Sequence, residues 1–270
     1  GLLGLHRTSN PDALRSGIRY NTLDHILFPQ NIVENANTII SNLGQVFPAR
    51  KDQFMLGPMA KIGWGTPTLL TIDVGIVIEM PDPVRLLIFG ILRAQLPSAE
   101  NAILRLQVNF LGIIDFKESY LSFDASLYDS KILTFGLYGD MALRLNWGNR
   151  PNFLLSVGGF HPSYTPPPLN LPSMKRLTIV LADQNNLKIA VESYFAVTSN
   201  SAQFGAHVYA MARAGKFRAE GELWFNVLFQ FSPFYFAADM GVKFAIKVGS
   251  KTLLGVYVAL MLEGPDPWRA

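Results

Sequence analysis

The chain has 270 residues, of which 49% are hydrophobic and 16% are charged, with a formal net charge of +3 and no cysteine. A charged share well below the usual one of about 25% indicates a chain with ample material for an apolar core. The absence of cysteine excludes disulfides and thiolate metal sites, and the scattered Lys and Arg residues argue against a nucleic-acid partner.

Residues 1–50 are expected to form a helical N-terminal segment. Asn10 followed by Pro11 predicts a helix start, because asparagine caps the first backbone N–H groups and proline is tolerated at the first helical position. The stretch 11–29 is therefore expected to hold one or two short helices. A second helix is expected between residues 31 and 48, where apolar residues recur with a helical period.

Beyond residue 50 the hydrophobic period changes from 3.6 to 2, which predicts antiparallel strands. In 68–80 the apolar residues occupy the even positions and are expected to form the buried face, with Asp73 and Glu79 between them. The alternation continues through 217–231 and 234–248, and most turns are short. We therefore predict an all-β fold: a long antiparallel β-meander, forming a curved sheet, groove or sandwich, with a short N-terminal helical segment.

Two distant segments of this meander, which is expected to span 51–270, are nearly the same. The first, 68–85, reads TLLTIDVGIVIEMPDPVR, and the second, 252–269, reads TLLGVYVALMLEGPDPWR. Half of the positions are identical at a constant offset, and the preceding strands also correspond. We interpret the similarity as the internal duplication of a hairpin, at 54–85 and 238–269, which must stack on neighbours to bury its face.

The sequence indicates no catalytic or metal-binding constellation. The four histidines are His6, His25, His161 and His207. Their surroundings fit no metal-ligand spacing, and His207 is expected on the solvated side of a strand. The acidic pair Glu220 and Glu222 suits the polar face of a strand more simply than acid–base chemistry. We therefore expect a protein that is not an enzyme and that has no cofactor.

The aromatic-rich segment 224–240 supplies the candidate functional surface. Alternation places four apolar side chains on one face of a strand, and two more on the next strand after a Ser-Pro turn. The candidates for an apolar groove or core are Phe225, Val227, Phe229, Phe231, Phe234 and Phe236. An ordinary core and a groove that holds lipid are both compatible with this pattern.

Several phrases carry a family resemblance, among them GPMAKIGWGTPTLL (57–70), NFLLSVGGFHPSYTPPP (152–168) and LFQFSPFYFAADM (228–240). The chain resembles a family of long uncharacterised bacterial proteins that share a β-rich domain of unknown function. The resemblance spans nearly the whole chain and brings no catalytic residues. It agrees with ends that look cut, since the first residues show no signal pattern, so we expect a piece of a longer polypeptide whose localisation is left open.

We expect a non-catalytic module of a larger bacterial protein that binds or shields lipid or other apolar matter along a curved sheet. The alternative is a structural module that pairs through its sheet edges into a fibre, tube or cargo shell. A lesser alternative is a segment of an outer-membrane-type β-barrel, because such barrels also use alternating strands of about ten residues. The expected partners are lipid or a hydrophobic protein, flanking domains of the same polypeptide and other copies of the chain.

Overall fold

The computed structural model describes residues 1–20, 31–82, 84–265 and 268. The chain divides into two compact units. The N-terminal unit comprises residues 1–133 and 142–152, and the C-terminal unit comprises residues 134–141 and 153–270. Both units are built from antiparallel strands, so the predicted all-β fold is confirmed.

The N-terminal unit combines a meander with two helices. Its strands are β1 (Leu2–Arg7), β2 (Ala49–Gly57), β3 (Met59–Trp64), β4 (Leu70–Met80), β5 (Arg85–Leu96), β6 (Leu104–Asp115), β7 (Tyr120–Leu127), β8 (Ser130–Ile132) and most of β10 (Asp140–Asn146). Its helices are α1 (Pro11–Arg19) and α3 (Ala36–Val46). Strands β3 to β7 pair antiparallel in chain order, and β1 pairs with β2.

Both predicted helices are present in the described residues. The side chain of Asn10 accepts hydrogen bonds from the backbone N–H groups of Asp12 and Ala13, each at 3.2 Å, and so caps α1 as expected. Residues 21–30, the end of the first predicted helical stretch, lie outside the described residues. Strand β1 was not predicted, because its sequence LLGLHR does not alternate between apolar and polar residues.

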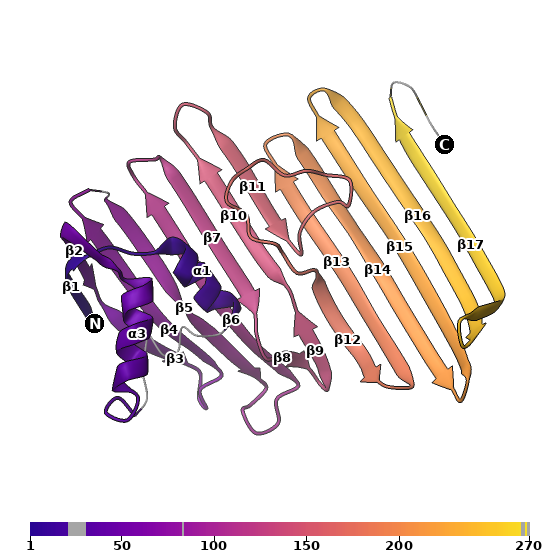
Figure 1. Cartoon of the computed structure of the whole chain (residues 1–270), viewed down its shortest axis with the longest axis horizontal. Coiled ribbons are helices and arrows are strands. Elements are labelled where there is room, and N and C mark those ends of the chain that lie inside the picture. Colours follow the sequence, from indigo (N-terminus) through magenta and orange to yellow (C-terminus); the bar gives the residue numbers. More distant parts are fainter. Residues whose placement is uncertain (21–30, 83, 266–267, 269–270) are drawn as a thin grey trace. The chain divides into compact units, whose positions relative to one another are not determined.

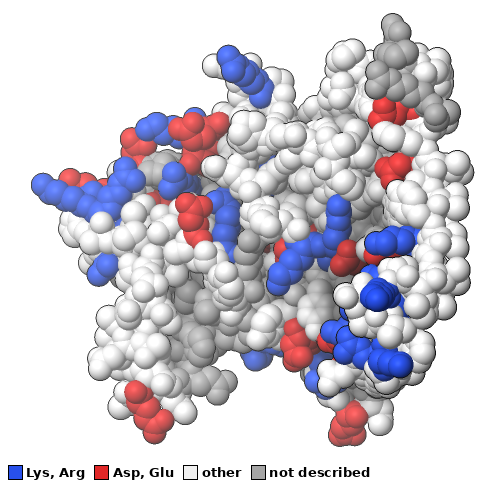
Figure 2. Space-filling view, turned by 45° about the vertical axis from the view of Figure 1, so that its right-hand side comes forward, with Lys and Arg blue, Asp and Glu red and all other residues white. Residues whose placement is uncertain are grey.

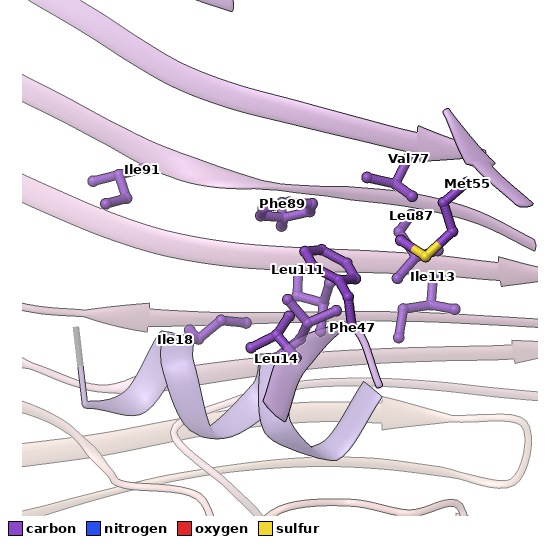
Figure 3. Close-up of a cluster of buried hydrophobic side chains, with 11 residues drawn as sticks. Leu14, Ile18, Phe47, Met55, Val77, Leu87, Phe89, Ile91, Leu111 and Ile113 are labelled. Carbon is purple, nitrogen blue, oxygen red and sulfur yellow. The ribbon is translucent and has the colours of Figure 1, made fainter. Parts of the chain in front are cut away.

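Helices α1 and α3 cover one face of the N-terminal strands (Figure 1). Leu14 and Ile18 of α1 point toward the side chains of Phe89 and Leu111 on the sheet (Figure 3). The buried cluster consists of Leu14, Ile18, Val46, Phe47, Met55, Val77, Leu87, Phe89, Ile91, Leu111 and Ile113. This contact between helices and sheet forms the main apolar core of the unit.

The covered face of β4 is the opposite of the predicted one. Val77 and Glu79 are buried, whereas Ile76 and Ile78 remain 36% and 37% exposed. The reason is that the helical segment lies on the odd face, where the buried carboxylate of Glu79 accepts a hydrogen bond of 2.6 Å from the Ser9 hydroxyl. The prediction that the even, apolar positions of 68–80 form the buried face is therefore wrong.

The C-terminal unit is a meander of long strands. Its strands are β9 (Phe135–Tyr138), most of β11 (Asn152–Val157), β12 (Leu177–Gln184), β13 (Leu187–Thr198), β14 (Ser201–Ala214), β15 (Phe217–Phe231), β16 (Phe234–Val248) and β17 (Lys251–Gly264). Strands β12 to β17 pair antiparallel in chain order through two-residue turns. The long connection 158–176 joins β11 to β12, and β17 lies at the end of this sheet, beside β16 (Figure 1).

The two similar hairpins have the same strand–turn–strand form but different turns. Five residues separate β3 from β4, whereas two separate β16 from β17. In the first hairpin, Ile62 pairs with Ile72. In the second, Ile246 corresponds to Ile62 and pairs with Leu254, which lies two positions before the residue that corresponds to Ile72. A shift of two leaves every side chain on the same face. The duplication of the hairpin stays a prediction.

Candidate functional site

The six apolar candidate residues lie together on one face of β15 and β16. Phe229 is directly opposite Phe236, and Phe231 is directly opposite Phe234. The rings of Phe229 and Phe236 are stacked with their centroids 6.3 Å apart. This register follows from the two-residue turn at Ser232–Pro233, which places the aromatic residues before the turn opposite those after it.

This apolar face, defined by the odd positions of β15 and the even positions of β16 and β17, is open to solvent. Phe231 and Phe234 are 54% and 55% exposed, and Leu260 on β17 is 65% exposed. Other side chains of the face that are at least 38% exposed are Phe217, Leu223, Phe225, Phe229, Met240, Val242, Phe244, Leu254, Val256, Val258 and Leu262. Over the surface seen in the space-filling view, charged side chains form small groups with uncharged areas between them (Figure 2). Contiguous exposed apolar surface of this kind is uncommon on monomeric soluble proteins.

A shallow cavity of about 370 Å³ is formed on β15, β16 and β17. It is lined by Leu223, Trp224, Phe225, Met240, Gly241, Val242, Val258 and Leu260. No ionisable side chain belongs to this lining. A hydrocarbon chain can therefore bury apolar surface there without taking a charge out of water.

Strand β17 is apolar on its second face as well. Leu253, Tyr257 and Met261 alternate with the apolar-face residues and are all more than half exposed. Within β17 the ionisable groups with a formal charge are Lys251 and Glu263, one near each end. A long exposed strand of this kind is a ready partner for another strand.

The opposite, polar face of the C-terminal sheet holds a second cavity of about 220 Å³. It is lined by Pro162, Arg176, Glu192, Ser193, Tyr194, Ala206, His207, Trp224 and Asn226. Pro162 and Arg176 come from the connection 158–176, and the other residues come from β13, β14 and β15. The connection thus supplies one wall and the sheet supplies the floor.

The floor of the polar cavity is held by a chain of hydrogen bonds. The Tyr194 hydroxyl donates to Asn226 Oδ1 at 3.1 Å, and Asn226 Nδ2 donates to Asp239 Oδ2 at 3.0 Å. Beyond it, His161 Nε2 lies 3.7 Å from Asp239 Oδ1. Burial lowers the pKa of His161, against the opposing effect of the Asp239 carboxylate, and so favours a neutral ring.

Arg176 lies over the ring of Tyr194 at the wall of the cavity. Its guanidinium carbon is 4.1 Å from the centroid of the Tyr194 ring, and its Nη1 donates to the Gly158 carbonyl at 3.0 Å. Burial raises the pKa of Tyr194 and lowers the pKa of Arg176. The phenol therefore stays protonated at neutral pH and acts as a hydrogen-bond donor.

His207 lies between two carboxylates near the same cavity. Its Nδ1 is 3.8 Å from Glu192 Oε2, and its Nε2 is 3.8 Å from Glu222 Oε2. Glu222 also pairs with Lys243 at 3.3 Å. Among the described residues, no group of three or more acidic or histidine side chains is arranged to hold a metal ion.

Sequence reasoning missed the polar cavity. It treated His207 and Glu222 as solvated strand residues. The sequence signal that was present is the strand-face register itself, because Glu192, His207 and Trp224 are cross-strand neighbours. The position of Arg176 over Tyr194 has no comparable signal, since a loop has no period.

No helix in the described part of the chain has both the length and the apolar character that a membrane-spanning helix requires. No curated protein and no solved structure matches the chain. One protein family matches it over residues 1–270, and this family is described as a family of unknown function (DUF6603). The chain, a β-rich polypeptide with an open apolar sheet face, thus belongs to the DUF6603 family.

Proposed function

We propose that the chain is a non-catalytic module whose C-terminal sheet binds lipid acyl chains along its apolar face. The observation that carries the proposal is the open face of β15–β17 with its apolar cavity of about 370 Å³. Folding leaves this surface in water, where exposed hydrocarbon is unfavourable, and an acyl chain would cover it.

The extent of the face favours an elongated ligand. Exposed apolar side chains run from Phe231 and Phe234 at one end of the hairpin to Phe217 at the other. Each methylene buried against them would contribute about 0.8 kcal/mol. A linear acyl chain can follow a strand and collect many such contributions, whereas its polar head needs no partner inside the face.

Native mass spectrometry of the gently purified protein, followed by lipid extraction, tests the proposal directly. We expect added masses that correspond to acyl-chain compounds in a stoichiometric amount. A bare protein mass, together with no change in the fluorescence of added cis-parinaric acid, would contradict acyl-chain binding.

Two neighbouring residues of β17 offer a matched pair of variants. Leu260 lines the apolar cavity opposite Met240, while Met261 faces the other side of the sheet opposite Asp239. Leu260→Gln should weaken cis-parinaric acid binding about tenfold, because an amide without a partner in hydrocarbon costs about 1–3 kcal/mol. Met261→Gln should leave binding unchanged, and equal effects of both variants would refute this site.

A second candidate function, assembly through the sheet edge, is favoured by β17. Residues 251–262 are all exposed, and within the described part of the C-terminal unit β17 pairs with β16 alone. An antiparallel pair of two β17 strands centred on Tyr257 would place Lys251 of one copy opposite Glu263 of the other. Leu254 would then face Leu260, so this register joins opposite charges and apolar side chains alike.

Single cysteines test this assembly, because the chain has none of its own. Tyr257→Cys should give a disulfide-linked dimer under mild oxidation, since the two copies of position 257 face each other. Leu253→Cys should not, because its counterpart would be Met261 and the two cysteines would lie roughly 27 Å apart along the strand. A monomer with Tyr257→Cys, or equal cross-linking of both variants, would exclude this register.

A further inference from the structure

We propose that the cavity of about 220 Å³ on the polar face of the C-terminal sheet binds a neutral sugar ring, stacked on Trp224. This site lies on the opposite face of the sheet and is independent of the acyl-chain proposal, although Trp224 belongs to the lining of both cavities. It rests on the orientation of Trp224, on the polar groups around the cavity and on the balance of their charges.

Trp224 provides a flat apolar platform. A Cβ atom placed on Gly241, its cross-strand partner, would come within 2.7 Å of three atoms of the six-membered ring of the indole. The ring therefore lies over the backbone of Gly241. Tyr257 extends the platform, with its ring centroid 6.0 Å from that of Trp224 and the planes 31° apart. The C–H face of a pyranose packs on such flat aromatic surfaces.

The remaining lining supplies paired donors and acceptors. Glu192 brings a carboxylate, His207 an imidazole and Arg176 a guanidinium group. The carboxylate and the guanidinium group can each bind two neighbouring hydroxyl groups, and each imidazole nitrogen can bind one, because hydroxyl groups both donate and accept hydrogen bonds. The wall is preorganised, because Arg176 is held by the Gly158 carbonyl and the Tyr194 ring. A ligand therefore loses little free energy to ordering of that wall.

The charges of the lining favour a neutral ligand. Arg176 and Glu192 offset each other, and Glu222 beyond His207 is offset by Lys243. A phosphate or carboxylate ligand would lie against Glu192, and a cation would lie against Arg176. An acyl chain would leave these polar groups without hydrogen-bond partners, which costs about 1–3 kcal/mol for each group. A neutral sugar ring can form hydrogen bonds with these polar groups through its hydroxyl groups and can pack its C–H face on Trp224.

An array of neutral monosaccharides and oligosaccharides, followed by saturation-transfer NMR with the soluble form of the strongest hit, tests the proposal. We expect at least one glycan to bind, with saturation transferred to its ring protons. Trp224→Ala should abolish the transfer, and Trp224→Phe should restore part of it, because a flat ring is retained. If no neutral glycan binds, or if Trp224→Ala binds as well as the wild type, the proposal is overturned.

Two further variants test glycan binding at positions where a substitution should not unfold the protein. Glu192→Gln replaces a charged hydrogen-bond acceptor with a neutral amide at a partly exposed strand position. It should weaken glycan binding at least about tenfold. Leu260→Gln, on the opposite face of the sheet, should leave glycan binding unchanged while it weakens cis-parinaric acid binding. An unchanged affinity in Glu192→Gln would exclude the proposed hydroxyl contacts.

Discussion

The indole of Trp224 lies over Gly241, the residue directly opposite it on β16. A glycine is required at this place because any Cβ would occupy the space that the ring fills. The pair thus holds a large aromatic side chain close to the backbone on the polar face of the sheet. Tyr194 lies over Gly205, its own cross-strand partner, in the same way, so the polar cavity has two such pairs in its floor.

Gly241→Ala should displace the Trp224 ring and destabilise the C-terminal unit by about 1–3 kcal/mol, as overpacking generally does. The measurement is urea unfolding, with near-UV circular dichroism to report the indole environment. Gly221→Ala is the matched control, because a Cβ there meets no atom within 4 Å. Its stability should be unchanged or slightly higher, and an equal loss in both variants would contradict the role of the close approach.

Asp124→Ala should destabilise the N-terminal unit by about 3–5 kcal/mol. Asp124 binds Arg144 at 2.7 Å and Arg15 at 3.1 Å, and the Arg144 side chain is only 1% exposed. Removal of the carboxylate would break the ion pair of a buried guanidinium group. Urea unfolding measures the loss, with Asp82→Ala as control. The exposed pair of Asp82 with Lys117 should contribute less than about 1 kcal/mol.

Acidification should destabilise the C-terminal unit through His161. Burial lowers the pKa of this histidine in the folded protein, so the unfolded chain takes up its proton at a higher pH. The unfolded state then binds more protons, and the free energy of unfolding falls as the pH drops below about 6.5. Urea unfolding between neutral and mildly acidic pH measures this slope. In His161→Gln the slope should be smaller, and an identical slope would refute the assignment.

Leu14→Ala should cost about 2–5 kcal/mol, because Leu14 is fully buried between α1 and the sheet. Leu3→Ala is the control, since Leu3 is 71% exposed on β1 and should change stability by less than about 0.5 kcal/mol. Hydrogen exchange of the α1 backbone distinguishes the two effects. Loss of protection in α1 should accompany Leu14→Ala and not Leu3→Ala.

Local sequence rules predicted the all-β class and the strands that correspond to β4, β15 and β16. Asn10 and Pro11 indicated the start of α1, and the two-residue turn at Ser232–Pro233 made the pairing of Phe229 with Phe236 predictable. In both cases the decisive interactions join residues close in sequence. Alternation alone could not tell which face of β4 is covered, because that depends on where α1 and α3 pack.

The polar cavity was beyond prediction for a similar reason. Arg176 reaches Tyr194 from a connection without regular structure, and His161 approaches Asp239 across nearly eighty positions of sequence. Such contacts arise from the path of a loop over a sheet, which has no periodic signature. The apolar candidates were found because their positions follow a period of 2, whereas their exposure depends on the absence of a covering layer in the described residues.

Because Phe231, Met240 and Leu260 are exposed, substitutions there should affect folding and acyl-chain binding differently. Each keeps more than half of its surface in water, so polar replacements there should change folding stability little. Randomised libraries of this face should therefore give an almost flat map when scored for the amount of folded protein. The same libraries scored for acyl-chain binding should show these positions as intolerant, which assigns their hydrophobicity to recognition instead of folding.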